Sequence, residues 1–331
     1  MTEGQSPTGR RTRISKLTAL PPGLLARRML NVKGLKNAAQ AKALSFVRTP
    51  QPKVYGRLGD LEVRLAAGRP DILQAQRLRY EVFYEEMSAR PNPVAAMRRL
   101  DQDAYDAICD HLLVVDTSAG PHGRERWAHR RRPRVVGTYR LLRQDIAARS
   151  LGFYTQSEYD IAPLVRAKSP DCRFLELGRS CVLKPYRSKR SVELLWHGLW
   201  TYVREHRVDV MIGCASFEGT DPKAHAMALS YLHHFARAPD DWLCPAHPHL
   251  HQRMDLLLRE QVDLKQALKA MPPLIKGYLR LGAFVGDGAV IDRQFGTTDV
   301  LIILPVAKID PRYFEHFGAP DELKSRLSPA D

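Results

Sequence analysis

The chain has 331 residues, of which 44% are hydrophobic and 26% are charged, and its 51 Lys and Arg residues against 36 Asp and Glu residues give a net charge of +15. This composition is typical of a globular protein and excludes a fibrous or wholly disordered chain. No apolar run approaches the roughly 20 residues that span a bilayer, and the first residues lack the pattern of a secretory signal, so we expect a soluble, cytoplasmic protein.

Residues 1–57 form a basic arm, with twelve Lys and Arg residues and one acid, Glu3, for a net charge of 12 − 1 = +11. A basic segment interrupted by leucines can lie on an anionic membrane surface or dock an acidic protein. It can equally be a solvated, disordered tail. These interpretations stay open. We expect any membrane contact to be peripheral, on the cytoplasmic face of the inner membrane, and we expect no nucleic-acid partner.

The first elements expected after the arm are one strand and two helices. Alternating apolar residues over 61–65 predict the strand. Helical spacing over 71–87 predicts a helix that Asp71 caps, and Pro93 begins a second helical stretch that runs to about residue 108.

Strands and helices then alternate to the end of the chain. Runs at 112–115 and 135–142 predict a hairpin whose connection, residues 124–134, is an exposed arginine-rich loop. The later elements expected are a strand, an amphipathic helix, a strand, a helix capped by Asp221, a helical region and a last strand, at residues 173–183, 188–205, 209–217, 221–235, up to about 281, and 299–306. This order predicts a mixed α/β sheet, with a core over 58–240 and a C-terminal extension over 241–331 packed on that core.

Several short motifs lack a requirement of the site that they resemble. His247, His249 and His251 alternate in a Pro-rich loop without a fourth metal ligand. Asp101 and Asp103 have the spacing of a calcium loop but not its glycine. The five cysteines are scattered without a C-x-x-C pair, which indicates reduced thiols. We therefore expect no metal site.

The spacing of His111 and Asp116 matches the H-x-x-x-x-D motif of the lysophospholipid acyltransferases, and residues 217–220 resemble their downstream block. The two side chains lie an odd number of residues apart on a predicted strand, which places them on opposite faces. They are therefore not expected to act together on one hydroxyl, and this activity stays an alternative of lower rank.

Four short stretches form one constellation of charged and aromatic side chains. Its members are Arg79 and Phe83 on the first helix, Asp103 and Asp106 on the second, Arg140 on a strand, and Glu176 and Arg179 on the following strand. In this order, over about residues 60–240, they resemble the signature of the N-acylhomoserine lactone synthases, which take acyl chains from acyl carrier protein on a GNAT fold.

Other blocks resemble a neighbouring branch of that fold. Residues 179–182, 216–222, 272–282 and 291–299 are similar to the hemolysin-like GNAT branch, in particular the L-ornithine N-alpha-acyltransferases of bacterial ornithine lipid synthesis, over about residues 58–317. The tryptophan that usually follows the first lactone-synthase motif is absent, which argues against the lactone substrate.

The resemblance implies a GNAT-like acyl-CoA N-acyltransferase fold, α/β with a mixed sheet and a C-terminal extension. It also implies transfer of a 3-hydroxyacyl chain from acyl carrier protein to the α-amine of L-ornithine. The product would be lyso-ornithine lipid, the first step of ornithine lipid synthesis. The thioester would be a co-substrate, and no cofactor is expected.

The resemblance implies two catalytic residues, Glu176 and Arg179. The amine must lose a proton before it attacks, and Glu176 is the expected base because it lies on the strand that lines the thioester in GNAT folds. The alternative is that Glu176 only pairs with Arg179. Backbone N–H groups near Cys181 and Val182 are expected to polarise the thioester carbonyl.

The acceptor needs acids for its amines and a guanidinium for its carboxylate. Asp103 and Asp106 are expected to hold the cationic end, and Arg79 or Arg140 the carboxylate, with Phe83 beside the substrate. The alternative is a salt-bridged network that holds the helices to the strand.

Donor binding is expected at residues 184–191, where GNAT proteins hold phosphate at a helix N-terminus. Because the usual glycines are absent, a single pantetheine phosphate bound by side-chain charge is favoured over coenzyme A. Arg187, Lys189 and Arg190 would also steer an acidic acyl carrier protein.

Two other functions stay open. One is a lactone synthase-like acyltransferase, which would need S-adenosylmethionine. The other is a non-catalytic module that binds an acyl carrier or a membrane.

Overall fold

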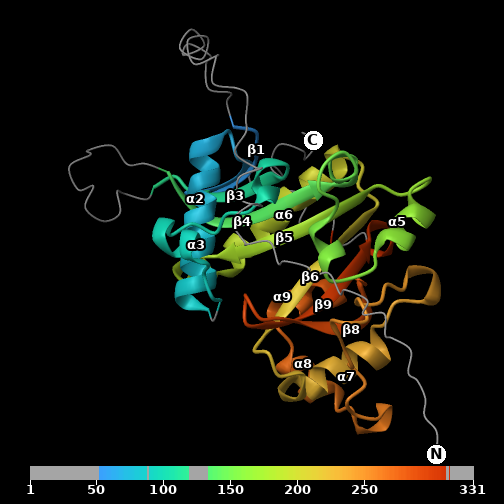
Figure 1. Ribbon diagram of the computed structural model, residues 1–331. Helices are drawn as coiled ribbons and strands as arrows, with labels where there is room; N and C mark the ends of the chain where they lie inside the picture. The colour runs from blue at the N-terminus through green and yellow to red at the C-terminus, as the bar shows by residue number, and fades with distance from the viewer. Residues whose placement is uncertain (1–51, 88, 119–132, 311–312, 314–331) are drawn as a thin grey trace, which may run out of the picture. The chain divides into compact units, whose positions relative to one another are not determined.

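One mixed sheet of nine strands organises the protein (Figure 1). The computed structural model describes residues 52–87, 89–118, 133–310 and 313, so most of the basic arm and residues 124–132 of the arginine-rich loop lie outside the described residues. The strand order is β1-β2-β3-β4-β5-β6-β9-β8-β7. The strands are β1 (Val54–Leu58), β2 (Leu61–Leu65), β3 (Asp110–Asp116), β4 (Arg134–Arg143), β5 (Phe174–Val182), β6 (Val210–Glu218), β7 (His251–Gln252), β8 (Phe284–Asp292) and β9 (Thr297–Pro305). The expectation of a mixed α/β fold is confirmed.

Two helices cover opposite faces of the first half of the sheet, α2 (Arg69–Tyr80) on one and α6 (Lys189–Glu205) on the other (Figure 1). Neighbouring residues of β3 alternate between them. His111 donates from Nε2 to the carbonyl oxygen of Asp106 at 3.0 Å, on the α2 side. Leu112 packs against α6 at Gly198, where an added Cβ would lie 3.2 Å from the leucine. Both apolar faces of the strands are therefore removed from water.

The amphipathic helix predicted over 188–205 is confirmed as α6. Ser188 caps it by accepting from the Ser191 N–H at 3.4 Å. Gly198 lies on its buried face, where a Cβ would come within 2.4 Å of Val63. The glycine therefore allows α6 to approach β2 closely.

The other helices are shorter. They are α3 (Pro93–Arg98), α4 (Gln144–Ala147), α5 (Ala162–Lys168), α7 (Ala226–Phe235), α8 (Leu264–Ala270) and α9 (Pro273–Arg280). None of the helices in the described ranges has the length and apolar character needed to cross a bilayer.

Strands β5 and β6 separate after a short stretch of parallel pairing. They pair from Phe174 with Val210 to Glu176 with Ile212, and no pairing between them follows. Strand β6 continues instead along β9 over its whole length. At the point of divergence, a Cβ on Gly213 would lie 2.3 Å from the Leu177 carbonyl oxygen, so only glycine fits there. The divergence opens a gap within the sheet, beyond Glu176.

The two helices predicted over residues 71–87 and 93–108 are each divided in the structure. Helix α2 continues as a single π-helical segment, η1 (Glu81–Glu86), and its N-cap is Gly68. The predicted cap Asp71 instead pairs with Arg64 and accepts from the Ala67 N–H. The expectation that Asp71 caps this helix was therefore wrong.

The second predicted helix ends early because Arg99 adopts a left-handed conformation, with φ of 51°. The chain then turns, and Asp103 caps a short 3-10 helix, η2 (Ala104–Ala107). The continuous helix over 93–108 was therefore wrong, and Asp103 and Asp106 do not share a helical face with the residues before them.

Three strands were not expected: β1, β8 and the two-residue β7, which pairs with β8. Strand β1 pairs with β2, so the last residues of the segment treated as a basic arm belong to the sheet. Strand β8 pairs with β9, and β9 pairs with β6. The C-terminal segment therefore completes the sheet rather than packing on a finished core. The glycines and the bulge in β8 explain why its sequence does not alternate like a strand.

Candidate active site

A cavity of about 460 Å³ lies where β5 and β6 diverge. Its walls come from β5 beyond Glu176, from β6, from the segment around Tyr154, from η1 and from the turn between β8 and β9. Seven of the twelve residues proposed for the site line it: Phe83, Arg140, Glu176, Arg179, Cys181, Val182 and Arg187. The divergent strands thus bring together residues that are distant in sequence.

Glu176 lines this cavity, and each oxygen of its carboxylate accepts a backbone hydrogen bond. Its two oxygens accept backbone N–H groups of Tyr154, at 2.8 Å, and Thr155, at 2.6 Å. Burial raises the pKa of Glu176 above its ordinary value, although these hydrogen bonds oppose the shift. The alternative, that Glu176 only pairs with Arg179, was wrong, because Arg179 pairs with Asp101 and Asp103.

Arg79 lies outside the cavity and is completely buried. Its guanidinium contacts Asp101 at 2.7 Å and Asp106 at 2.9 Å. Burial alone would raise the pKa of Asp106, but the Arg79 charge holds it below its ordinary value. This arrangement is the salt-bridged network that the sequence left open, and it fixes α2 to the segment before β3.

Besides Arg187, two arginines line the cavity, Arg140 and Arg179. Arg140 contacts Asp103 at 2.6 Å, and its guanidinium lies over the rings of Tyr105 and Tyr154. Arg179 contacts Asp101 and Asp103 at the longer distances of 3.4 and 3.5 Å.

The Arg179 side chain is held between two aromatic rings. Its guanidinium carbon is 5.0 Å from the ring centre of Tyr154 and 4.5 Å from that of Phe295. Phe295 also packs edge-on against Phe83, at 5.7 Å between ring centres. The Arg179 backbone has φ of 50°, in the left-handed region that non-glycine residues rarely occupy. The strand is therefore distorted at the residue that presents this guanidinium to the cavity.

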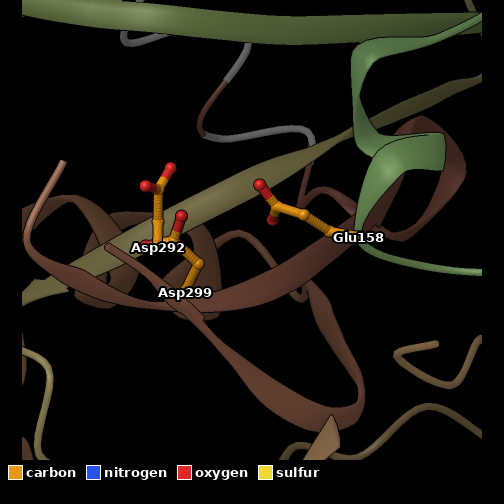
Figure 2. A group of neighbouring side chains, drawn as sticks. All are labelled: Glu158, Asp292 and Asp299. Carbon is orange, nitrogen blue, oxygen red and sulfur yellow. The ribbon is translucent and has the colours of Figure 1, made fainter. Parts of the chain in front are cut away.

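Sequence reasoning missed three acids on the cavity wall, Glu158, Asp292 and Asp299, which we call the acid cluster (Figure 2). One oxygen of each lies within 4.8 Å of the others. Burial raises the pKa of Glu158 to about 7 and that of Asp299 to about 6, and neighbouring carboxylates add to both shifts.

The acids of this cluster come from different parts of the chain. Glu158 follows the 3-10 helix η3 (Tyr154–Ser157), Asp292 ends β8 and Asp299 lies within β9. One sequence signal was available, since Asp299 is an acid on a strand whose residues are all buried. Nothing local in the sequence connects it to the other two.

The residues predicted to bind the acyl donor divide into two groups. Cys181 and Val182 line the cavity on the edge of β5 that leaves β6. Arg187 lines its mouth, pairs with Glu86 and donates to the Val182 carbonyl oxygen at 2.9 Å. Lys189 and Arg190 are exposed at the start of α6, outside the cavity.

Two motifs set aside in the sequence have separate structural partners. His111 bonds to Asp106 as described, and Asp116 accepts from the Tyr186 hydroxyl at 2.7 Å. They therefore do not form a dyad. In the histidine-rich loop, His247 donates to the Gln156 carbonyl oxygen at 2.9 Å.

Comparison with known proteins finds a matching family model and relatives along most of the chain. The family model of the GNAT acetyltransferase domain matches residues 78–197. An L-ornithine N(alpha)-acyltransferase of Brucella abortus is 52% identical over 280 residues, which is 85% of this chain and 96% of the relative. One of Rhizobium meliloti is 51% identical over 291 residues, 88% of this chain and 95% of the relative.

Solved structures show more distant similarity. FeeM, an N-acyl amino acid synthase from uncultured soil microbes, is 10% identical with a TM-score of 0.41, over 78% of this chain and 93% of its own. The acyl-homoserine lactone synthase LasI is 13% identical with a TM-score of 0.36, over 73% and 89%.

Proposed function

The chain belongs to the L-ornithine N-alpha-acyltransferases and is an acyltransferase with a GNAT domain, and from this premise we propose its substrates and the residues that act on them. The acceptor is L-ornithine, acylated on its α-amine. The donor is a 3-hydroxyacyl chain carried as a thioester by acyl carrier protein. The observation that supports this proposal best is the cavity at the divergence of β5 and β6, which combines an open strand edge, guanidinium groups and acids.

The reaction forms one C–N bond and breaks one C–S bond. The α-ammonium first loses a proton, and the free amine then attacks the thioester carbonyl. The tetrahedral intermediate expels the thiolate of the pantetheine arm, which takes up the second proton from nitrogen. The enzyme must therefore supply two things, a base that takes a proton from the amine and hydrogen-bond donors that stabilise the oxyanion.

Glu176 is the proposed base, acting directly or through one water molecule. Its raised pKa makes the ionised carboxylate a stronger base than that of an exposed glutamate. Backbone N–H groups of β5 near Cys181 and Val182 are the proposed oxyanion donors, since this edge of the strand is not paired with β6. The hydrogen bonds from Tyr154 and Thr155 would keep the Glu176 carboxylate oriented.

The acceptor carboxylate is proposed to bind Arg179, with Arg140 beside it. Both guanidinium groups line the cavity, whereas Arg79 does not. Arg179 makes only long contacts with its acids, so it has donors to offer an anion. Phe83 is proposed to contact the substrate from the same wall.

The donor is proposed to enter past Arg187, whose position at the cavity mouth suits the pantetheine phosphate. Lys189 and Arg190 lie exposed beside it and would attract an acidic carrier protein. No cofactor is needed for this chemistry, since the thioester supplies the activated acyl group.

The basic arm is proposed to hold the protein at an anionic membrane, on its cytoplasmic face, where an acylated amino acid would partition. Deleting residues 1–50 keeps β1 intact. We expect this deletion to weaken binding to anionic vesicles and to leave activity in a vesicle-free assay. Unchanged vesicle binding would contradict this role for the arm.

The activity is tested with the purified chain, 3-hydroxyacyl carrier protein and L-ornithine, followed by mass spectrometry. We expect a product with the mass of ornithine plus one 3-hydroxyacyl group, and a loss of about two orders of magnitude in rate for Glu176→Gln. An acyl lactone formed only with S-adenosylmethionine would support the lactone synthase instead. No acylated product from folded protein would support the non-catalytic module.

A further inference from the structure

The acid cluster concentrates negative charge without a matching cation. None of its three carboxylates forms an ion pair with another described residue, although the charged groups around Arg79, Arg140 and Arg179 are paired. Asp292 is partly satisfied, because it accepts the backbone N–H groups of Gln294 and Phe295 at 2.7 and 2.9 Å. The carboxylates face one another across a short gap (Figure 2).

Polar atoms on the same wall are incompletely hydrogen-bonded. The hydroxyl groups of Ser216 and Thr297 lie near enough to lower the pKa of Asp299, and the Cys214 thiol lowers that of Glu158, each against the larger effect of burial. Glu158 Oε2 and Asp299 Oδ1 are buried and make no hydrogen bond of ordinary geometry with the described residues. The same is true of the hydroxyl of Thr297, a neutral residue that is 4% exposed and lines the cavity beside Asp299. A buried polar group without a well-formed hydrogen bond is unfavourable, so a ligand that completed these hydrogen bonds would be stabilised here.

Resting on the proposed function, we propose that the acid cluster binds the side-chain ammonium of the acceptor and so selects a diamino acid over a neutral one. An ammonium group offers three N–H donors and one positive charge. Glu158, Asp292 and Asp299 offer carboxylate oxygens that lie within 4.8 Å of one another. The ligand would complete the hydrogen bonds that these buried oxygens lack.

The positive charge of Arg179, beside the acid cluster, supports an amino acid as the ligand. The Arg179 charge acts on both Glu158 and Asp299, since it lowers the pKa of each against the larger effect of burial. An acceptor with a carboxylate at one end and an ammonium at the other neutralises Arg179 and the acid cluster together. A divalent metal ion would satisfy the acids alone and leave Arg179 without an anion, and at the same distance the guanidinium would repel it about twice as strongly as a singly charged ammonium.

The two amines of ornithine would bind in different parts of the cavity. The α-amine would lie toward the thioester at the unpaired edge of β5, whereas the side-chain amine is held by the acid cluster and stays ionised. Holding the side-chain amine as an ammonium also prevents its acylation, because an ammonium has no lone pair for attack. The acid cluster would thereby fix both the choice of acceptor and the choice of nitrogen.

The test compares L-ornithine with L-norvaline, which has the same carbon chain without the side-chain amine. Asp299→Asn and Glu158→Gln are assayed separately, and Asp287→Asn is the control because it lies on β8 outside the cavity, paired with Arg237 at 3.4 Å. For each cluster variant we expect kcat/KM with ornithine to fall about 10- to 100-fold, as for loss of one charge-assisted hydrogen bond, and the norvaline rate to change less than about threefold.

Other outcomes would overturn the inference. Equal losses with both acceptors would place the acids in the chemistry or the fold, and an unchanged ornithine preference would place the side-chain amine elsewhere. Loss of ornithine turnover on dialysis against a chelator, restored by Mg²⁺ or Mn²⁺, would assign the acids to a metal ion. Failure of the unaltered protein to acylate ornithine would instead refute the proposed function itself.

A binding measurement gives a second readout that does not depend on turnover. Calorimetry near pH 6.5 in two buffers of different ionisation enthalpy counts protons exchanged on binding. We expect ornithine to release protons from the acid cluster, because a bound ammonium favours the charged carboxylates, and norvaline to release none. Equal proton exchange for the two ligands would contradict the assignment.

Discussion

Replacing Glu158 with glutamine should change how the stability of the protein depends on pH. Glu158 is buried, and burial raises its pKa from 4.5 to about 7, with a further contribution from Asp299. An unfolded chain releases this proton near pH 4.5, whereas the folded protein keeps it to about pH 7. The folded state therefore binds more protons than the unfolded state between these values, and stability falls as pH rises through the window.

The size of this effect follows from the two pKa values. Each bound proton contributes about 1.4 kcal/mol per pH unit, so Glu158 lowers the free energy of unfolding by about 2–3 kcal/mol between pH 5 and pH 8. A glutamine at this position has no proton to lose. Between pH 5 and pH 8, we therefore expect Glu158→Gln to gain about 2–3 kcal/mol relative to the unaltered protein.

Urea unfolding followed by tryptophan fluorescence measures this difference at several pH values. The control is Glu218→Gln, because Glu218 is an exposed acid at the end of β6. We expect the control to follow the unaltered protein at every pH. Parallel curves for Glu158→Gln and the unaltered protein would refute the reasoning, since they would mean that Glu158 ionises alike in the folded and unfolded chain.

Three further predictions concern the fold and the donor. Replacing the buried Arg79 with methionine should lower the free energy of unfolding by about 3–5 kcal/mol, because it removes the closest cation from Asp101 and Asp106 in the core and leaves them only contacts of 3.4 and 3.5 Å with Arg179 and Arg140; unchanged urea unfolding would contradict this. Gly213→Ala should destabilise the protein by about 1–3 kcal/mol and lower activity, because its Cβ would meet the Leu177 carbonyl oxygen at the divergence of the strands; wild-type melting and rate would contradict it. Replacing Lys189 and Arg190 with alanine should raise KM for the acyl carrier protein several-fold at low salt with kcat unchanged; an equal effect with a small acyl thioester, measured in parallel, would rule out steering.

Local patterns in the sequence were sufficient for much of the fold. Strands β3, β4, β5, β6 and β9 and helix α6 lie within a few residues of their predicted positions, because each has an apolar pattern that repeats over its own length. The resemblance to GNAT N-acyltransferases rested on short motifs in a fixed order, and the relatives confirm the family. Strands β1 and β8 were missed because glycines interrupt their alternation.

The sequence also selected residues that the structure brings to one cavity, including Arg140, Glu176 and Arg179. It did not decide what each of them contacts. Whether Glu176 meets Arg179 or the backbone of Tyr154 depends on the path of a distant loop. The same holds for Arg79, whose charge is neutralised inside the core rather than offered to a ligand.

The sequence by itself therefore determined the fold class, the family and the strand that bears Glu176, because these depend on periodicity and on motifs within short segments. Only the tertiary structure decided that β5 and β6 diverge into a cavity and that Glu158, Asp292 and Asp299 meet on its wall. These acids come from segments up to 141 residues apart (299 − 158). Their charges interact because the sheet brings β8 and β9 beside the segment that follows η3 and removes water from between them, and no local pattern encodes that proximity.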